Sequence, residues 1–185
     1  MRTDEVVMLV LYASDRKMVA GRTLLQKTIY FLNEKNNLGI EFVPYYYGPY
    51  SAEIADAVES LKASGIVKEV VEEFPVFNTS VGFEPRRYIY QLTEIGEKIA
   101  ENVKNKYPEE AERIRDQLSF MKTFDEAQDY RNLSIAAKMY HILKIENKPR
   151  TIDEIKEEAE FLGWNIGEKG AEDALNFLKG LKMVE

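Results

Sequence analysis

The chain is dominated by apolar residues at helical spacing. Ile54, Val58 and Leu61 recur three or four positions apart, which predicts one buried helix face. Ser51 precedes this face as a candidate N-cap, and Gly65 follows it as a candidate stop. Similar patterns and end signals predict helices over residues 3–13, 21–35, 51–64, 94–105, 108–124, 133–146, 151–162 and 168–181.

Three stretches rich in β-branched and aromatic residues are typical of strands instead. They cover residues 42–47, 67–74 and 87–92. Pro44 indicates an edge or a bulge in the first. The last two are separated by a predicted loop over residues 75–85 and directly follow a short helix. This layout predicts a mainly α protein with a small antiparallel sheet (α+β), arranged as a winged helix-turn-helix domain.

Capping residues and a polar stretch indicate where helices and domains begin and end. Thr93 is expected to cap a helix whose Gly96 allows close packing, and Thr151 with Glu154 forms a T-x-x-E capping box. The polar stretch 125–131 is the predicted boundary between a winged-helix domain with trailing helices (1–124) and an all-helical C-terminal unit (132–185). Residues 174–185 faintly repeat residues 57–68. Two interpretations stay open: a divergent second helix-turn-helix, or two ordinary helix ends.

Composition narrows the classes of function. The chain of 185 residues has a net charge of −7 and no cysteine, which excludes disulfides, a thiol nucleophile and cysteine-bound zinc. No apolar stretch approaches the ~20 residues of a membrane span, and we find no signal peptide. We therefore expect a cytoplasmic protein that makes no membrane contact.

Candidate chemistry is sparse. His141 is the sole histidine, and it lies within a predicted helix without an identifiable partner. No Ser/His/Asp arrangement, P-loop or dinucleotide fingerprint occurs. The acidic residues Glu157, Glu158 and Glu160 are better explained as a solvated helix face than as a metal site. We expect no catalysis, no cofactor and no metal.

An aromatic run ends at a tight corner, with the sequence Tyr45-Tyr46-Tyr47-Gly48-Pro49-Tyr50-Ser51. Three interpretations of these tyrosines stay open: packing of a strand in the core, which is the simplest, a protein interface, or stacking of bases. We also hypothesise that Gln26 and Lys27 brace the corner through hydrogen bonds to its backbone. The candidate interface residues are Tyr45, Tyr47, Tyr50, Gln26 and Tyr30.

Three blocks carry a family resemblance. Residues 21–32, GRTLLQKTIYFL, and the corner YYYGPYS resemble two motifs of a YwgA-like family of small prokaryotic proteins. Both blocks are also similar, less closely, to the Panacea (SocA-like) antitoxin domain, which prefers a small aliphatic residue where Tyr50 stands. Residues 90–96, YQLTEIG, are similar to the segment that closes the wing of many winged-helix regulators. The resemblance covers residues 1–105 and implies a winged-helix fold and a regulatory role, without catalytic residues.

The charges bear on nucleic-acid binding. In a winged helix the helix before the two strands normally enters the major groove. Here that helix carries Glu53, Asp56 and Glu59 against one Lys62, a pattern that phosphates repel. The candidate phosphate contacts are Arg86, Arg87, Lys27 and Arg22. The alternative interpretation of Arg86 and Arg87 is solvated charges that protect a strand edge.

Together these observations predict a non-catalytic regulatory protein that acts by macromolecular recognition, antitoxin-like or regulator-like. A protein partner at the tyrosine-rich corner is favoured. The alternative is a DNA-binding transcription regulator that contacts phosphates through the wing. We expect a homodimer, paired through the helices of residues 94–124.

Overall fold

The computed structural model describes residues 1–73 and 86–185, which form a mainly helical α+β protein, as predicted. The α-helices of these ranges are α1 (Thr3–Ala13), α2 (Arg22–Asn36), α3 (Ala52–Ala63), α4 (Glu94–Lys106), α5 (Pro108–Met121), α6 (Tyr130–Glu146), α7 (Ile152–Phe161) and α8 (Glu168–Gly180). Two 3₁₀ turns are η1 (Asp15–Lys17) and η2 (Asp125–Gln128). The strands are β1 (Met18–Ala20), β2 (Val67–Glu73) and β3 (Arg86–Leu92). The loop predicted over 75–85 and the end of the strand at Phe74 lie outside the described residues.

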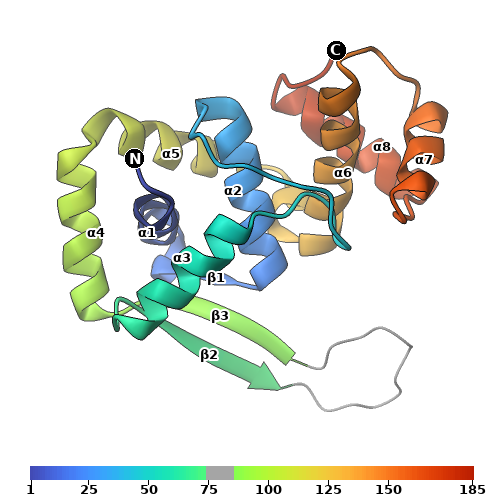
Figure 1. Ribbon diagram of the computed structural model, residues 1–185. Coiled ribbons are helices and arrows are strands. Elements are labelled where there is room, and N and C mark those ends of the chain that lie inside the picture. The colour runs from blue at the N-terminus through green and yellow to red at the C-terminus, as the bar shows by residue number, and fades with distance from the viewer. Residues whose placement is uncertain (74–85) are drawn as a thin grey trace.

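The sheet has the order β1-β3-β2, and both pairings are antiparallel. Val19 lies opposite Tyr90, and Val67 lies opposite Leu92. Figure 1 shows β2 and β3 projecting together beyond the helices; we call this pair the arm. The strand β1 was not predicted, because three residues are too few to show an alternating pattern.

The helix α1 lies at the centre of the first part of the molecule, packed against α3, α4 and α5 (Figure 1). Its apolar residues Val6, Val7, Val10 and Leu11 are all fully buried. Thr3, whose residue type favours an N-cap, is instead the first residue of the helix, and Arg2 takes the cap position.

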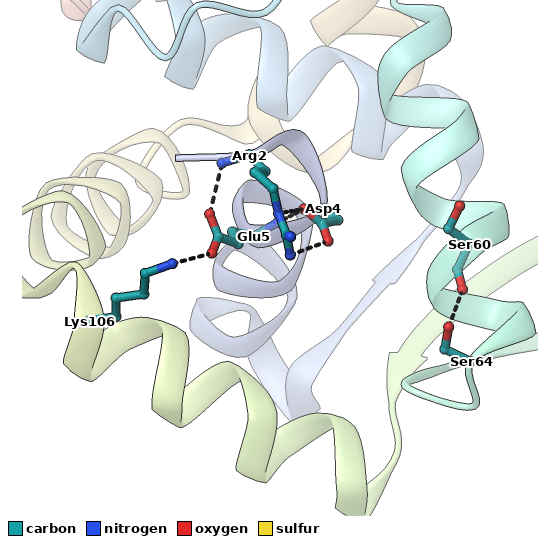
Figure 2. Close-up of polar contacts among 6 residues, drawn as sticks. All are labelled: Arg2, Asp4, Glu5, Ser60, Ser64 and Lys106. Carbon is teal, nitrogen blue, oxygen red and sulfur yellow. Dashed lines mark hydrogen bonds and ion pairs between the residues drawn. The ribbon is translucent and has the colours of Figure 1, made fainter.

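The start of α1 is fixed instead by the buried carboxylate of Glu5. Arg2 donates its backbone N–H to Glu5 Oε2 at 2.8 Å, and Lys106 Nζ donates to Glu5 Oε1 at 3.1 Å (Figure 2). Burial alone would raise the pKa of Glu5, but the contacts with Arg2 and Lys106 outweigh it and hold the pKa below its ordinary value. The contact with Lys106 links α1 to α4.

Most predicted helix ends are confirmed. Thr93 accepts a hydrogen bond from the N–H of Gly96 at 3.0 Å, and both halves of the capping box at Thr151 form. Gly65 ends α3 with a φ of +68°, next to the Ser64 hydroxyl that donates to the Ser60 carbonyl in the last turn (Figure 2).

Gly96 has the predicted close neighbour. A Cβ atom at this position would lie 2.0 Å from the carbonyl oxygen of Ile66, the residue before β2. The absence of a side chain at Gly96 therefore lets α4 pack directly on the base of the arm.

The C-terminal helices share the core of the first part. The helix α6 packs on α2 and on α8, and the rings of Phe31 and Phe177 meet edge to face with centroids 5.3 Å apart. Lys35 Nζ also donates to the Leu181 carbonyl at 2.7 Å. The predicted boundary at 125–131 falls on η2 and the start of α6, and one apolar core continues across it.

Candidate functional site

The segment of residues 43–51, here called the tyrosine corner, is a closed loop and not the strand predicted over 42–47. Val43 and Tyr50 exchange backbone hydrogen bonds of 2.9 and 2.8 Å. Inside this bridge Tyr45 and Gly48 exchange bonds of 3.2 and 3.0 Å. Gly48 takes a φ of +96°, which suits glycine alone, so the chain reverses direction where a strand would continue.

Two side chains of α2 brace the corner by hydrogen bonds to its backbone. Gln26 donates from Nε2 to the Ser51 carbonyl at 2.9 Å and accepts from the Ser51 N–H at Oε1 at 3.0 Å. Lys27 Nζ donates to the Pro49 carbonyl at 2.6 Å. All three contacts are buried, and they confirm the predicted brace. Ser51 does not cap α3 with its side chain, because its buried hydroxyl makes no hydrogen bond within the described residues.

A second brace comes from the C-terminal part. Trp164 Nε1 donates to the Tyr45 carbonyl at 2.6 Å, and Figure 1 shows the connection between α2 and α3 extending toward α6 before it returns. Sequence reasoning missed Trp164. Its one available signal was the presence of a single tryptophan in the chain, just after a helix-ending Gly163.

The tyrosine side chains point outward from this fixed backbone. Tyr45, Tyr46 and Tyr47 are 53%, 78% and 58% exposed, so their assignment to the core is wrong. The Tyr45 ring lies 4.9 Å from that of Tyr46 and 5.0 Å from that of the half-buried Tyr50, measured between centroids. The result is an exposed aromatic cluster, which with the exposed Val43 extends along most of the corner.

Two other interface candidates are buried. Tyr30 is 1% exposed and packs edge to face against Phe31 and Phe42, so it belongs to the core. Gln26 supports the corner from inside and does not reach the surface. Tyr30 is not a surface contact because the Tyr140 and His141 rings of α6 pack against it, and Gln26 is not one because its amide is held by the Ser51 backbone.

A group of polar side chains is buried beneath the corner, where α2 meets α6. Burial, with a smaller effect of Lys138, lowers the pKa of Lys27 to about 7, and burial also lowers the pKa of Lys138. Burial lowers the pKa of His141 and raises that of Tyr30. The predicted phosphate contact at Lys27 is therefore wrong, because its amine lies inside the protein.

The charged face of α3 is as predicted. Glu53, Asp56 and Glu59 are exposed, and Lys62 Nζ lies 2.9 Å from Glu59 and 3.2 Å from Glu69. The single lysine of this helix is thus neutralised by carboxylates. A phosphate-lined groove would meet a negative surface.

The arginines at the arm also lie beside carboxylates. Arg86 Nε is 3.3 Å from Glu73, and Arg87 Nη2 is 2.7 Å from Glu72, across the β2–β3 pairing. Arg22 lies over the Tyr88 ring at 3.8 Å and donates to the Tyr90 hydroxyl at 3.0 Å. These contacts orient the guanidinium groups within the protein, although each side chain stays about half exposed.

Over the ranges 1–73 and 86–185, no group of three His, Asp or Glu side chains is placed to hold a metal ion. The helices of these ranges are too short or too polar to cross a membrane. No model of a known protein family matches the chain, and no curated protein matches it.

Proposed function

We propose that this is a non-catalytic recognition protein that binds a protein partner through the tyrosine corner. The observation that carries the proposal is the exposure of Tyr45, Tyr46 and Tyr47 on a backbone held from both sides by buried donors. Tyrosine is enriched among the residues that dominate binding energy at interfaces. A loop that is already ordered loses less conformational entropy when it binds.

The charge distribution supports a protein partner over DNA. The exposed carboxylates of α3 repel phosphates, and the arginines Arg86 and Arg87 already have carboxylates beside them. An exposed aromatic cluster with few charges matches the composition of protein interfaces, whose centres are rich in aromatic residues and poor in charge.

The order α1-β1-α2-α3-β2-β3 supports a winged-helix arrangement within this proposal. In that arrangement α3 is the helix before the wing, and the arm is the wing. The resemblance of residues 21–32 and of the corner to YwgA-like and Panacea-like proteins supports a regulator-like or antitoxin-like role.

Affinity capture from a lysate of the native host tests the proposal. Three baits are compared by quantitative mass spectrometry: the wild type, a variant with Tyr45, Tyr46 and Tyr47 changed to Ala, and a variant with Arg86 and Arg87 changed to Ala. A partner of the corner is retained by the wild type and by the arginine variant, and is lost with the tyrosine variant. Equal retention by the tyrosine and wild-type baits would contradict the proposal.

The alternative, DNA binding through the wing, rests on the half-exposed guanidinium groups of Arg86 and Arg87 at the outer end of the described part of the arm. Backbone contacts by arginine make affinity fall steeply as salt rises. Titration of random duplex DNA at low and moderate salt tests this. Salt-dependent binding that the arginine variant loses would favour the alternative, and absence of binding at low salt would exclude it.

A further inference from the structure

Four buried polar side chains meet where α2 packs on α6, and we call them the lysine cluster. Lys27 and Tyr30 lie one turn apart on α2, and Lys138 and His141 lie one turn apart on α6. Their exposed fractions are 2%, 1%, 9% and 6%. The two helices thus present a Lys-x-x-Tyr and a Lys-x-x-His face to one seam.

The tyrosine corner covers this seam at Gly48. A Cβ atom built on Gly48 would lie 3.0 Å from Lys138 Cγ and 3.5 Å from Lys27 Cε, so both lysine stems converge on this point. The rings of Tyr30 and His141 meet in the same seam, with centroids 6.1 Å apart, and Lys27 acts electrostatically on His141. The four groups therefore belong to one site, although they come from two distant parts of the chain.

Most polar atoms of the lysine cluster have no hydrogen-bond partner. Within the described part of the chain, Tyr30 Oη and both ring nitrogens of His141 are buried and unpaired. Lys138 Nζ approaches the Trp164 ring at 5.7 Å and forms no hydrogen bond there, while Lys27 has the single acceptor at Pro49. Buried polar groups are paired in most native proteins, so this concentration at one seam requires an explanation.

The lysine cluster also lacks a counter-charge. No carboxylate among residues 1–73 and 86–185 lies within ion-pair distance of Lys27 or Lys138. Glu34 is the carboxylate that acts electrostatically on Tyr30 and His141, and it is already held by Lys144 Nζ at 2.8 Å. The site therefore offers amine, imidazole and hydroxyl donors without a matching anionic acceptor.

We propose that the lysine cluster binds a small oxyanion, a carboxylate or a phosphate group, beneath the tyrosine corner. The donors are the ammonium groups of Lys138 and Lys27, the hydroxyl of Tyr30 and one N–H of His141. An oxyanion accepts several hydrogen bonds at once and supplies the negative charge that the two lysines lack. Access requires the corner to lift at Gly48 and Pro49, because these residues lie over both lysine stems.

Binding is coupled to protons. Burial lowers the pKa of Lys27 to about 7 and also lowers the pKa values of Lys138 and His141, so the empty cluster disfavours the protonated forms of all three side chains. A bound anion favours the protonated forms and raises these pKa values. The affinity for the anion therefore increases as the pH falls through 7.

The single histidine of the chain gives a direct probe, because its imidazole proton signals in an NMR spectrum have only one source. Sodium phosphate and sodium acetate are titrated separately at pH 6.5, with sodium chloride adjusted to keep the ionic strength constant. We expect a saturable shift of the His141 signals with at least one of the two anions. The anion that saturates at the lower concentration identifies the ligand class.

Three variants assign the response to the lysine cluster. Lys138→Met keeps the apolar stem and removes the amine, and we expect the affinity to fall at least tenfold. Tyr30→Phe removes only a hydroxyl and should weaken binding by roughly ten- to a hundredfold, the effect of one hydrogen bond to a charged group. Lys122→Met, which removes a partly exposed lysine paired with Asp15 at 3.2 Å, serves as the control and should leave the affinity unchanged.

Three results would overturn the proposal. One is the lack of a saturable His141 shift with either anion. Another is wild-type affinity in Lys138→Met, or in Tyr30→Phe if the first variant does not fold. The third is loss of response in the Lys122→Met control, which would show that a general charge effect, and not this site, causes the shift.

Discussion

The tyrosine corner and the arm extend from opposite ends of α3, and they use their exposed groups in opposite ways (Figure 1). In the corner, the polar backbone atoms are paired with buried side chains and the tyrosines are left exposed. In the arm, the exposed charged side chains lie beside one another across the strands. Exposure alone therefore does not identify a recognition surface. The corner has exposed tyrosine side chains that can contact a partner. In the described part of the arm, the arginine side chains already lie beside carboxylates of the neighbouring strand.

The largest effect is expected where the brace of the corner is removed. Gln26→Leu leaves the N–H and the carbonyl of Ser51 buried without their partner. Each unsatisfied buried group costs about 1–3 kcal/mol, so for the two groups we expect the free energy of unfolding to fall by about 2–6 kcal/mol in urea denaturation. The matched control is Gln128→Leu, which removes one exposed hydrogen bond to the Lys122 carbonyl and should change stability by less than about 0.5 kcal/mol. An equal, small effect of both variants would contradict the brace.

A comparable test at the arm is Gly96→Ala. The added Cβ would meet the Ile66 carbonyl at 2.0 Å, and a backbone atom cannot move aside as a flexible side chain can. Overpacking of this kind costs about 1–3 kcal/mol, which thermal unfolding would detect. Gly167→Ala is the control, because a Cβ there meets no atom within 4 Å. Equal melting temperatures for the two variants would show that α4 does not pack on the arm so closely.

Several of these features could be predicted from the sequence because their causes are local. The capping box at Thr151 and the stop at Gly65 depend on residues within a few positions. The packing at Gly96 could be expected because a glycine inside a helix indicates a close neighbour, although the identity of that neighbour, Ile66, is not local. The brace by Gln26 and Lys27 could be proposed because both residues belong to the block at 21–32, which together with the corner carries the family resemblance.

Other features depend on contacts between distant parts of the chain. A polar residue such as Lys27 is normally assigned to the solvent face, but α2 lies between the sheet-bearing part and α6 and is covered on both sides. The tyrosines fit the period of a strand, whereas Gly48 and the Trp164 contact turn the backbone into a loop. No local pattern contains this information.

The buried amine below the corner predicts a dependence of stability on pH. The pKa of Lys27 is about 7 in the folded protein against an ordinary 10.5, so between these values the unfolded chain binds a proton that the folded protein does not. The contribution of Lys27 to the free energy of unfolding therefore increases as the pH rises from about 7 to 10.5, and it decreases again as the pH falls toward 7. The slope is at most about 1.4 kcal/mol per pH unit. Urea denaturation at pH 7, 8 and 9 should show a shallower slope for Lys27→Met than for the wild type. Parallel slopes would mean that Lys27 is charged in the folded state.

The smallest effect is expected from the arginines of the arm. Arg86→Ala and Arg87→Ala each remove an ion pair between exposed side chains, and such pairs contribute about 0–1 kcal/mol. We expect thermal unfolding to change little, and less at high salt than at low salt. A loss of several kcal/mol would show that the arm is part of the structural core, which would remove the contrast with the corner.

The central claim is that the exposed tyrosines form the partner-binding surface. The most direct measurement is the affinity of the purified partner, by calorimetry, for three proteins: the wild type, Tyr46→Ala and Arg86→Ala. Tyr46 has the most exposed of the three tyrosine side chains, so its truncation should not change the stability of the fold. We predict that Tyr46→Ala weakens binding at least tenfold, the loss expected of an interface residue that contributes more than about 1.4 kcal/mol, while Arg86→Ala stays within about twofold of the wild type. Unchanged affinity for Tyr46→Ala together with a large loss for Arg86→Ala would contradict the claim and place the partner on the arm.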